Sequence, residues 1–492
     1  MKFVLEAPSC RARQRVAALS ARFLVLPLFL AVLLVPEAAG ALTREEARHL
    51  LVRSGFAAEP AEIAALEPLS RAEAVERLLR EAGGEARTPA PAWTVGWRPP
   101  RLGDLSSEER RLLQRQNRER GLELKGWWMR EMATSPAPLT EVMTLFWHNH
   151  FTSSLRKVKA PVLLYRQNVL FREEALGNFA RLLHAMARDP AMLVYLDGAR
   201  SKKDAPNENF ARELFELFTL GEGHYGEADV KDAARAFTGW SLERQSGTFH
   251  LRRGWHDGGE KTILGRRGRF DGDDVIALLL DHPRTAAFVV EKLWRTFVSE
   301  TPEPAEVQRL ARLFREAGYE IKPLLAAIFT SDAFWAADNR GRLIKSPVDL
   351  LVGTLRLFDL PVDDFRDLAR LSRRLGQDLF DPPNVKGWPG GNDWITTASL
   401  LDRQALLTRV TGGKARAAMQ RSAMQDAPST GRAGRARLFD AWVEGLPGEW
   451  QSAEAVSLLL LAVQAVDVEV LDLQASGAQV RQLLRDPAYQ VK

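Results

Sequence analysis

Two histidines in the segment FWHNHF are the first residues whose types could do chemistry. His148 and His150 lie one residue apart among aromatic residues, and the chain has only eight histidines. Imidazole binds divalent metal ions and exchanges protons near neutral pH, so the pair could be metal ligands or a general acid and base. The alternative is a pair of buried histidines that bond to backbone groups. In a continuous helix the two rings point to nearly opposite sides, so a shared site requires the helix to end near Asn149.

The segment PNENFARELFELFTLGEG predicts a helix that begins after Asn207 and stops at Gly221. Helical spacing places Glu208, Arg212 and Glu213 on one polar stripe, whereas phenylalanine and leucine cover the rest of the helix. The carboxylates could form a solvated ladder with the arginine. They could instead face a cleft, where like charges raise the pKa of one carboxyl group and create an acid–base pair or a metal site.

Two loop segments complete the set of candidates. In WHDGGEKTILG, His256 and Asp257 precede a Gly-Gly turn, where side chains and backbone N–H groups could converge. A hydrogen-bonded turn without a ligand is the alternative. In FDPPNVKGWPGGNDWI, Lys386, Trp388 and Trp394 could line a substrate, because aromatic faces stack on sugars, peptides or flat ligands. The tryptophans could instead plug the end of a helical core.

Several well-known motifs do not occur in the sequence. It contains no P-loop, no GxGxxG after a strand, no HExxH, no GxSxG and no CxxC. These signatures therefore do not identify a reaction, and the candidate residues must be judged by their own chemistry.

The elements that must position these segments are helices. Apolar residues recur at helical spacing nearly throughout, and Ser106 with Glu109 forms a capping box at the start of a long helix. The segment 304–335 indicates two helices separated by a stop at Gly318. Three aspartates are predicted helix N-caps: Asp189, Asp332 and Asp486. We expect an all-α protein, a large multi-helix bundle or array of helical hairpins with long loops, and at most a short β-hairpin near 247–265.

The first 41 residues indicate a secretory signal peptide. Four arginines precede an apolar run at 23–35, and Ala39 and Ala41 form an A-x-A cleavage pattern. An uncleaved anchor is the alternative. Cleavage after Ala41 removes Cys10, the only cysteine, so the mature chain has no disulfide. We therefore expect an exported protein, periplasmic or extracellular, with no membrane span after cleavage.

The charge of the mature chain argues against nucleic acid as a partner. The full chain has a formal net charge of +5, but residues 1–41 hold five cations and two carboxylates, which leaves the mature chain at +2. No mature segment is polybasic. The expected division is a helical core at 42–410, a polar linker at 411–435 and a C-terminal helical segment at 436–492 that packs on the core.

The sequence resembles the bacterial domain of unknown function 1800 family. The segments that carry the resemblance, in chain order, are FWHNHF, YLDGARSKKDAPNENFARELFELFTLGEGHYGEADVKDAARAFTGW, HDGGEKTILG, KSPVDLLVGTLRL, LFDPPNVKGWPGGNDWI and LLRDPAYQ. The resemblance implies a large, exported, mostly helical bacterial protein. It also implies a second exported, alkaline-phosphatase-like protein as a functional partner. It does not imply a reaction.

The leading hypothesis from the residues is an enzyme of the hydrolase or lyase type that acts on an envelope or extracellular substrate. His148 and His150 would bind a divalent metal or act as acid and base, and the other charged candidates would complete a polar cleft. The alternative is a non-catalytic envelope scaffold or partner-binding protein whose motif loops form an interface.

Overall fold

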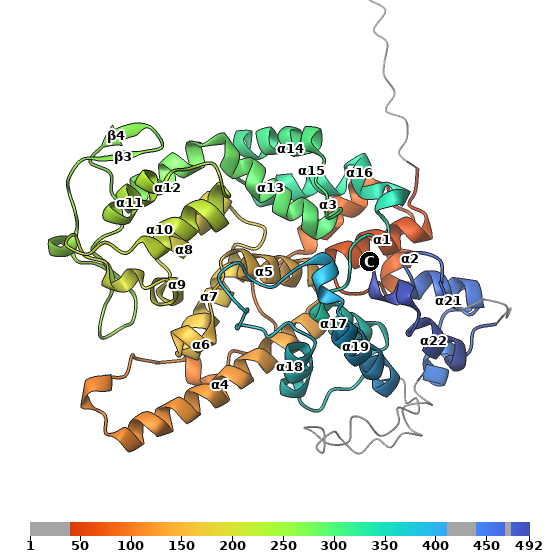
Figure 1. Ribbon diagram of the computed structural model, residues 1–492. Coiled ribbons are helices and arrows are strands. Elements are labelled where there is room, and N and C mark those ends of the chain that lie inside the picture. Colours follow the sequence, from red (N-terminus) through yellow and green to blue (C-terminus); the bar gives the residue numbers. More distant parts are fainter. Residues whose placement is uncertain (1–39, 411–438, 468–473) are drawn as a thin grey trace, which may run out of the picture. The chain divides into compact units, whose positions relative to one another are not determined.

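The computed structural model describes residues 40–410, 439–467 and 474–492, and helices are their main secondary structure (Figure 1). The predicted all-α fold is confirmed. Most of the predicted signal peptide and all of the predicted linker lie outside the described residues, so the division into domains stays a prediction. No helix in the described ranges is both long and apolar enough to cross a membrane.

The bounds of the helices follow the chain from its N-terminal side. The first group is α1 (Arg44–Ser54), α2 (Pro60–Leu66), α3 (Arg71–Glu81), α4 (Ser107–Thr134), α5 (Pro138–His150), α6 (Leu155–Val158), α7 (Pro161–Glu173), α8 (Phe179–Ala187) and α9 (Pro190–Tyr195). The middle group is α10 (Glu208–Glu213), α11 (Glu227–Ala236), α12 (Gly272–Asp281), α13 (Pro283–Phe297), α14 (Pro304–Glu316), α15 (Ile321–Phe329) and α16 (Asp332–Trp335). The last group is α17 (Pro347–Leu357), α18 (Phe365–Arg374), α19 (Thr397–Val410), α21 (Ala453–Leu460) and α22 (Gly477–Leu483).

Two short antiparallel hairpins stand where one was predicted. Strand β1 (Trp240–Leu242) pairs with β2 (Phe249–Leu251), and β3 (Lys261–Ile263) pairs with β4 (Arg266–Gly268). The second hairpin closes through Leu264 and Gly265, which both have positive φ, and this is the backbone that a two-residue hairpin turn requires. Strands β2 and β3, which lie inside the predicted interval 247–265, therefore pair with β1 and β4 and not with each other.

The helix boundaries follow the capping chemistry with one exception. Ser106 and Glu109 form the predicted capping box at the start of α4, and Gly318 has a φ of +63° just beyond α14. Asp189 and Asp486 are N-caps as predicted. The prediction for Asp332 was wrong, because the hydroxyl of the preceding Ser331 accepts the free backbone N–H and Asp332 is the first helical residue.

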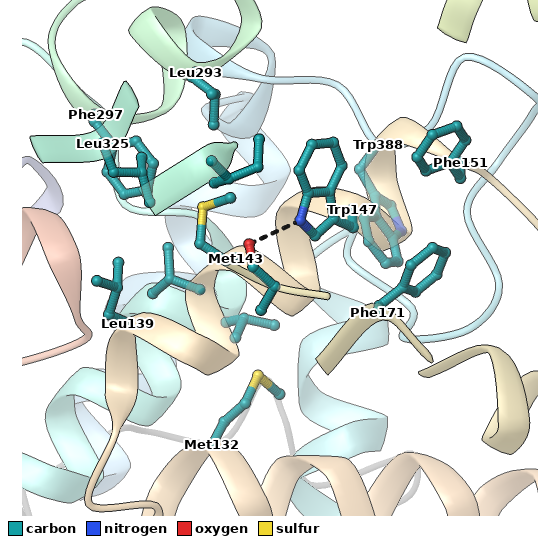
Figure 2. Packing of buried hydrophobic residues seen from close by; sticks show 14 of the residues in the cluster. Met132, Leu139, Met143, Trp147, Phe151, Phe171, Leu293, Phe297, Leu325 and Trp388 are labelled. Carbon is teal, nitrogen blue, oxygen red and sulfur yellow. Dashed lines mark hydrogen bonds between the residues drawn. The ribbon is translucent and has the colours of Figure 1, made fainter. Parts of the chain in front are cut away.

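The side chains of α5 lie in the main hydrophobic core. Trp147 is fully buried, and its Nε1–H donates to the carbonyl oxygen of Ala175 at 3.0 Å. Figure 2 shows Trp147 in one cluster with Phe151, Phe171 and Trp388, the last of which comes from a distant loop. Burying such a side chain contributes about 1.5–3 kcal/mol. The core thus joins the FWHNHF segment to the loop that contains Trp388.

Two buried arginines bind carbonyl groups at helix ends. Arg53 donates to the carbonyl oxygens of Phe297 and Val298, both at 2.9 Å, where α13 ends. Arg48 donates to the carbonyl oxygen of Leu459 at 3.0 Å, near the end of α21. The last carbonyls of a helix have no intrahelical donor, and they carry the negative end of its dipole. A cationic side chain both donates the missing hydrogen bonds and balances this partial charge.

The segment after Asp486 is tied to a much earlier part of the chain. Lys492 N–H donates to the carbonyl oxygen of Leu343 at 2.7 Å, and Lys345 N–H donates to that of Gln490 at 2.8 Å. Tyr489 is buried, and its hydroxyl lies 3.0 Å from that of Thr354 on α17, 135 residues earlier. These pairings fix the entry to α17.

Candidate functional site

His148 lies in an aromatic box formed by the rings of Trp128, Phe171, Phe380 and Trp388. The ring centroid of His148 is 5.3 Å from that of Phe380 and 5.4 Å from that of Trp388. Its side chain is buried, and its Nε2 has no hydrogen-bond partner among the described residues. Burial among rings lowers the pKa of His148 to about 3, so the imidazole is neutral at physiological pH.

His150 belongs to a polar cap formed by His150, Lys292 and the carbonyl groups of Leu217 and Phe218. The Lys292 ammonium donates to Nδ1 of His150 at 3.1 Å and to the carbonyl oxygen of Leu217 at 2.8 Å. Because Nδ1 accepts, the proton is on Nε2, which donates to the carbonyl oxygen of Phe218 at 3.2 Å. Burial, and then Lys292, hold the pKa of His150 well below its ordinary value. Burial also lowers the pKa of Lys292 to about 7.

The carbonyl groups of the polar cap come from the end of the helical segment that starts with α10. After α10 the chain continues as a π-helical turn, Leu214–Thr219, and it stops at Gly221, whose φ is +81°. Carbonyl groups in such a last turn need donors from outside the helix. His150 and Lys292 supply them, as the two arginines do at other helix ends. The polar cap is therefore an architectural solution to a helix terminus.

The two histidines do not share a site. Helix α5 continues through His150, so the rings of His148 and His150 point into different surroundings. In the described ranges no group of three or more His, Cys, Asp or Glu side chains is arranged to hold a metal ion. The geometry therefore does not support His148 and His150 as ligands of one metal. A helix end near Asn149 was the condition for a shared site, and α5 does not meet it because it includes His150.

The charged stripe on α10 forms a ladder on the surface. Arg212 donates to both carboxylate oxygens of Glu227 on α11, at 2.6 and 2.8 Å, and to Glu208 at 3.2 Å. Glu213 is half-buried, and burial together with the nearby Glu216 raises its pKa. The solvated-ladder alternative thus describes Glu208 and Arg212, which link α10 to α11. Glu213 directly precedes a short π-helical turn, which the sequence pattern did not reveal.

His256 and Asp257 tie their loop to the end of α11. His256 Nδ1–H donates to the carbonyl oxygen of Thr238 at 3.0 Å, and the Thr238 hydroxyl accepts the N–H of Asp257 at 2.8 Å. Asp257 accepts from Arg235 at 2.7 and 3.3 Å, and these bonds lower its pKa. Neither residue contacts His148 or the polar cap. The predicted single cleft of histidines and carboxylates is therefore not assembled.

The loop that contains Lys386, Trp388 and Trp394 packs on the end of α5. Trp388 N–H donates to Oδ1 of Asn149 at 2.7 Å. The exposed Lys386 lies 3.4 Å from Glu222, on the side of the α10 segment. Trp388 and Trp394 are only 5% and 7% exposed, so they support the loop from beneath and do not offer open faces to a ligand. Their role in substrate binding stays a prediction.

A pocket of about 530 Å³, here called the loop pocket, lies between this loop, α5, the end of α13 and the start of α17. Its walls include Asn149, Arg295, Glu300, Asp349, Gln377, Trp388, Gly390, Asn392, Asp393, Trp394 and Lys492. Two glycines with positive φ let the loop approach its neighbours. A Cβ at Gly387 would lie 2.2 Å from Oδ1 of Asn149, and one at Gly391 would lie 2.0 Å from a carboxylate oxygen of Glu300.

The charged side chains of the loop pocket have a small negative excess, because Arg295 and Lys492 stand against Glu300, Asp349 and Asp393. Lys492 is paired with Asp349 at 2.9 Å, and Arg295 lies 4.0 Å from Glu291. Glu300 and Asp393 remain without a cationic partner in the described part of the chain. The pocket therefore offers hydrogen-bonding carboxylates and amides without a concentrated charge.

Sequence reasoning missed most of these wall residues. Asn149 was considered only as a helix end, although it lies between the two histidines. Glu300 and Asp349 were not among the predicted site residues, because nothing in the sequence distinguishes them from other charged residues near helix ends. The glycines of the loop were the only signal that its backbone approaches something closely.

The family of the chain can now be stated. The family model described as "Protein of unknown function (DUF1800)" matches residues 49–491, nearly the whole chain. The chain belongs to this family. Neither the curated proteins nor the solved structures yielded a match. Membership in the DUF1800 family assigns no role to the loop pocket, and the alkaline-phosphatase-like partner and the cellular location stay predictions.

Proposed function

We propose that this DUF1800 protein is an exported binding protein whose loop pocket holds a small, hydroxyl-rich ligand of the saccharide class. The observation that carries the proposal is that FWHNHF and GWPGGNDW build one pocket together. Asn149 and Trp388 are bonded directly although they lie 239 residues apart in the chain. The apolar run at 23–35 supports export.

The chemistry of the walls favours a neutral polar ligand. Carboxylates such as Glu300 and Asp393 accept hydrogen bonds from hydroxyl groups, and amides such as Asn392 both donate and accept. An anionic ligand would be repelled by Glu300 and Asp393, which have no cationic partner in the described residues, because Lys492 already pairs with Asp349. The buried indoles below the loop hold these groups in fixed positions, which reduces the entropy lost on binding.

The arrangement supports binding better than it supports hydrolysis or proton abstraction. The neutral His148 faces rings, and both ring nitrogens of His150 are engaged. Of the carboxylates on α10, Glu208 pairs with Arg212 on the surface, and Glu213 is half-buried beside Glu216. A general acid–base pair needs two groups within hydrogen-bond reach of one reacting atom, and these residues do not provide it.

A glycine in the pocket wall allows a direct test. Gly390 has an extended backbone, and a Cβ there would meet no atom within 4 Å, so Gly390→Phe adds a bulky side chain at the pocket wall without straining the backbone. Gly258 is equally open but lies in the His256 loop, so Gly258→Phe is the matched control. Calorimetric titration with neutral disaccharides should give binding that Gly390→Phe weakens at least ~10-fold and Gly258→Phe leaves unchanged.

Two results would contradict the proposal. Equal binding by both variants would place the ligand elsewhere. Turnover of a disaccharide by the wild type that is lost in Glu213→Gln or His256→Ala would restore the enzyme hypothesis.

A further inference from the structure

A second concave site, here called the basic groove, lies away from the loop pocket, between α4, α6 and α18. Figure 1 labels these three helices. Its volume is about 670 Å³, and its walls share no residue with those of the loop pocket. Six cationic side chains face it: Arg118, Lys125, Arg156, Lys159, Arg370 and Arg373. Only two carboxylates do, those of Asp378 and Asp381.

The two carboxylates of the basic groove already bind neighbouring side chains. Asp378 binds the buried ammonium of Lys125, and Asp381 accepts from Ser154 and, at 2.9 Å, from Arg156. Arg373 also lies 3.7 Å from Asp378, and Arg370 pairs with Asp367. The other two cations at the rim of the groove are Arg118 and Lys159.

Two rim cations have no acidic partner. Arg118 on α4 and Lys159 after α6 are exposed, and neither forms an ion pair within the described residues. Their backbones adjoin, because Asn117, next to Arg118, donates to the carbonyl oxygen of Lys159 at 2.9 Å. An anion at this junction can therefore be approached by both cations.

The backbone of Lys159 is a second sign that its side chain matters. Lys159 closes α6 in the left-handed conformation, with a φ of +58°, where glycine or asparagine is the favourable residue. A lysine in this backbone conformation has a conformational cost. Such outliers gather at functional sites, and the inference runs from the outlier to the function.

The floor between the cations is apolar. Gly121, Leu122, Leu155, Pro161 and Ala369 line it. One close approach brings α18 against α4. A Cβ at Gly126 would lie 2.9 Å from the side chain of Arg366, so glycine lets the start of α18 lie against α4.

We propose that the basic groove binds an amphiphilic anion, a ligand that carries a phosphate, sulfate or carboxylate group on an apolar body. The oxyanion lies between Arg118 and Lys159, and the apolar body lies on Leu122, Leu155 and Ala369. The site is independent of the loop pocket and of its proposed ligand.

Three probes separate the contributions of charge and apolar surface. Octyl phosphate carries both, inorganic phosphate carries the charge alone, and octyl glucoside carries the chain without the charge. Octyl glucoside is titrated into Gly390→Phe, because its sugar could enter the loop pocket of the wild type. Calorimetric titration below the micelle concentration should show octyl phosphate binding at least ~10-fold more tightly than either of the others. Its affinity should fall as salt is added, because the rim cations are exposed.

A charge reversal tests the location. Arg118→Glu with Lys159→Glu should weaken octyl phosphate binding at least ~10-fold. The matched control is Arg312→Glu with Lys322→Glu, two exposed cations on α14 and α15, which should leave it unchanged. If the charge reversal prevents folding, Arg118→Gln with Lys159→Gln replaces it.

The outcomes that overturn the proposal are distinct. Equal affinity for octyl glucoside means that only apolar surface is recognised. Equal affinity for inorganic phosphate means that the apolar floor plays no part. Equal losses in the two double variants mean that binding follows the overall charge of the protein and not the basic groove.

Discussion

The aromatic box around His148 and the polar cap around His150 lie two residues apart on one helix and solve different problems. In the aromatic box the imidazole acts as a flat ring among rings, and its Nε2 has no partner in the described residues. In the polar cap both ring nitrogens hold hydrogen bonds that complete a helix end. Identical residue types in one short segment therefore need not share a function. Four substitutions can break or sharpen this comparison.

The largest effect is expected in acid, at His148. The folded-state pKa is about 3 and the ordinary value is 6.5, so between these pH values the unfolded chain binds a proton that the folded chain does not. Above pH 6.5 His148 is neutral in both states and does not lower the free energy of unfolding. As the pH drops to 3, the free energy of unfolding falls by on the order of 4 kcal/mol, because only the unfolded chain binds the proton. His148→Phe should flatten this dependence in urea unfolding at pH 7 and pH 4.5, with little change at pH 7.

Comparison of the variant with the wild type removes the contribution of other buried groups. Burial raises the pKa of Asp189 to about 7, so the folded chain holds a proton there that the unfolded chain loses above pH 3.8. Asp189 therefore contributes stability at low pH that is lost as the pH rises to 7, the opposite direction to His148. Parallel pH curves for wild type and His148→Phe would show that His148 is not desolvated.

The next effect is expected at neutral pH, at His150. His150→Phe keeps the ring but removes the donor to Phe218 and the acceptor of Lys292. Leaving these buried groups unpaired should cost about 1–3 kcal/mol in the free energy of unfolding at pH 7. The same substitution at His148 is the matched control. Equal losses at the two positions would remove the distinction between the aromatic box and the polar cap.

A smaller effect should appear in base, at Lys292. Its folded-state pKa is about 7 and its ordinary value is 10.5, so in this window the unfolded chain is protonated and the folded chain is not. The stability of the wild type relative to Lys292→Met should therefore rise with pH from 7 to 10.5, by about 1–2 kcal/mol at pH 9 after discounting for partial exposure. Melting temperatures of both proteins at pH 6 and pH 9 measure it, and a falling difference would reverse the assigned sign.

The smallest effect is expected at Arg212, on the surface. Arg212→Ala breaks the links to Glu208 and Glu227, which should cost about 0.2–1 kcal/mol because exposed ion pairs are screened by water. Arg309→Ala, which breaks an exposed pair with Glu306, is the control. A loss of several kcal/mol at Arg212 alone would bring back the buried cleft that the sequence pattern allowed.

Much of the fold could be predicted from local signals. The proline-led starts of α13 and α17, the capping box at Ser106 and the stop at Gly318 all act within a few residues. The π-helical turn at Leu214 could not be predicted, because its sequence keeps ordinary helical spacing. Neither could the partner of His150, since Lys292 lies 142 residues away. Local propensity does not specify which distant side chain satisfies a helix end.

The candidate residues divide in the same way. The FWHNHF segment and the Trp388 loop do come together, through Asn149, and the tryptophans do plug a core. The charged stripe and the His256 loop do not join them. The basic groove escaped prediction because its cations come from three helices, and each helix taken alone shows an ordinary solvated face.

The backbone pairing of Leu343 with Lys492 has a consequence for how the chain acquires its fold. The edge that receives Gln490 and Lys492 is made long before its partner, because Tyr489 follows Thr354 by 135 residues. Until that partner has been synthesised, the side chains of α17 that Tyr489 contacts lack this cover, so this part of the core is completed late. For a protein that is exported as proposed, this delay keeps the chain in a state that a translocation channel can still thread.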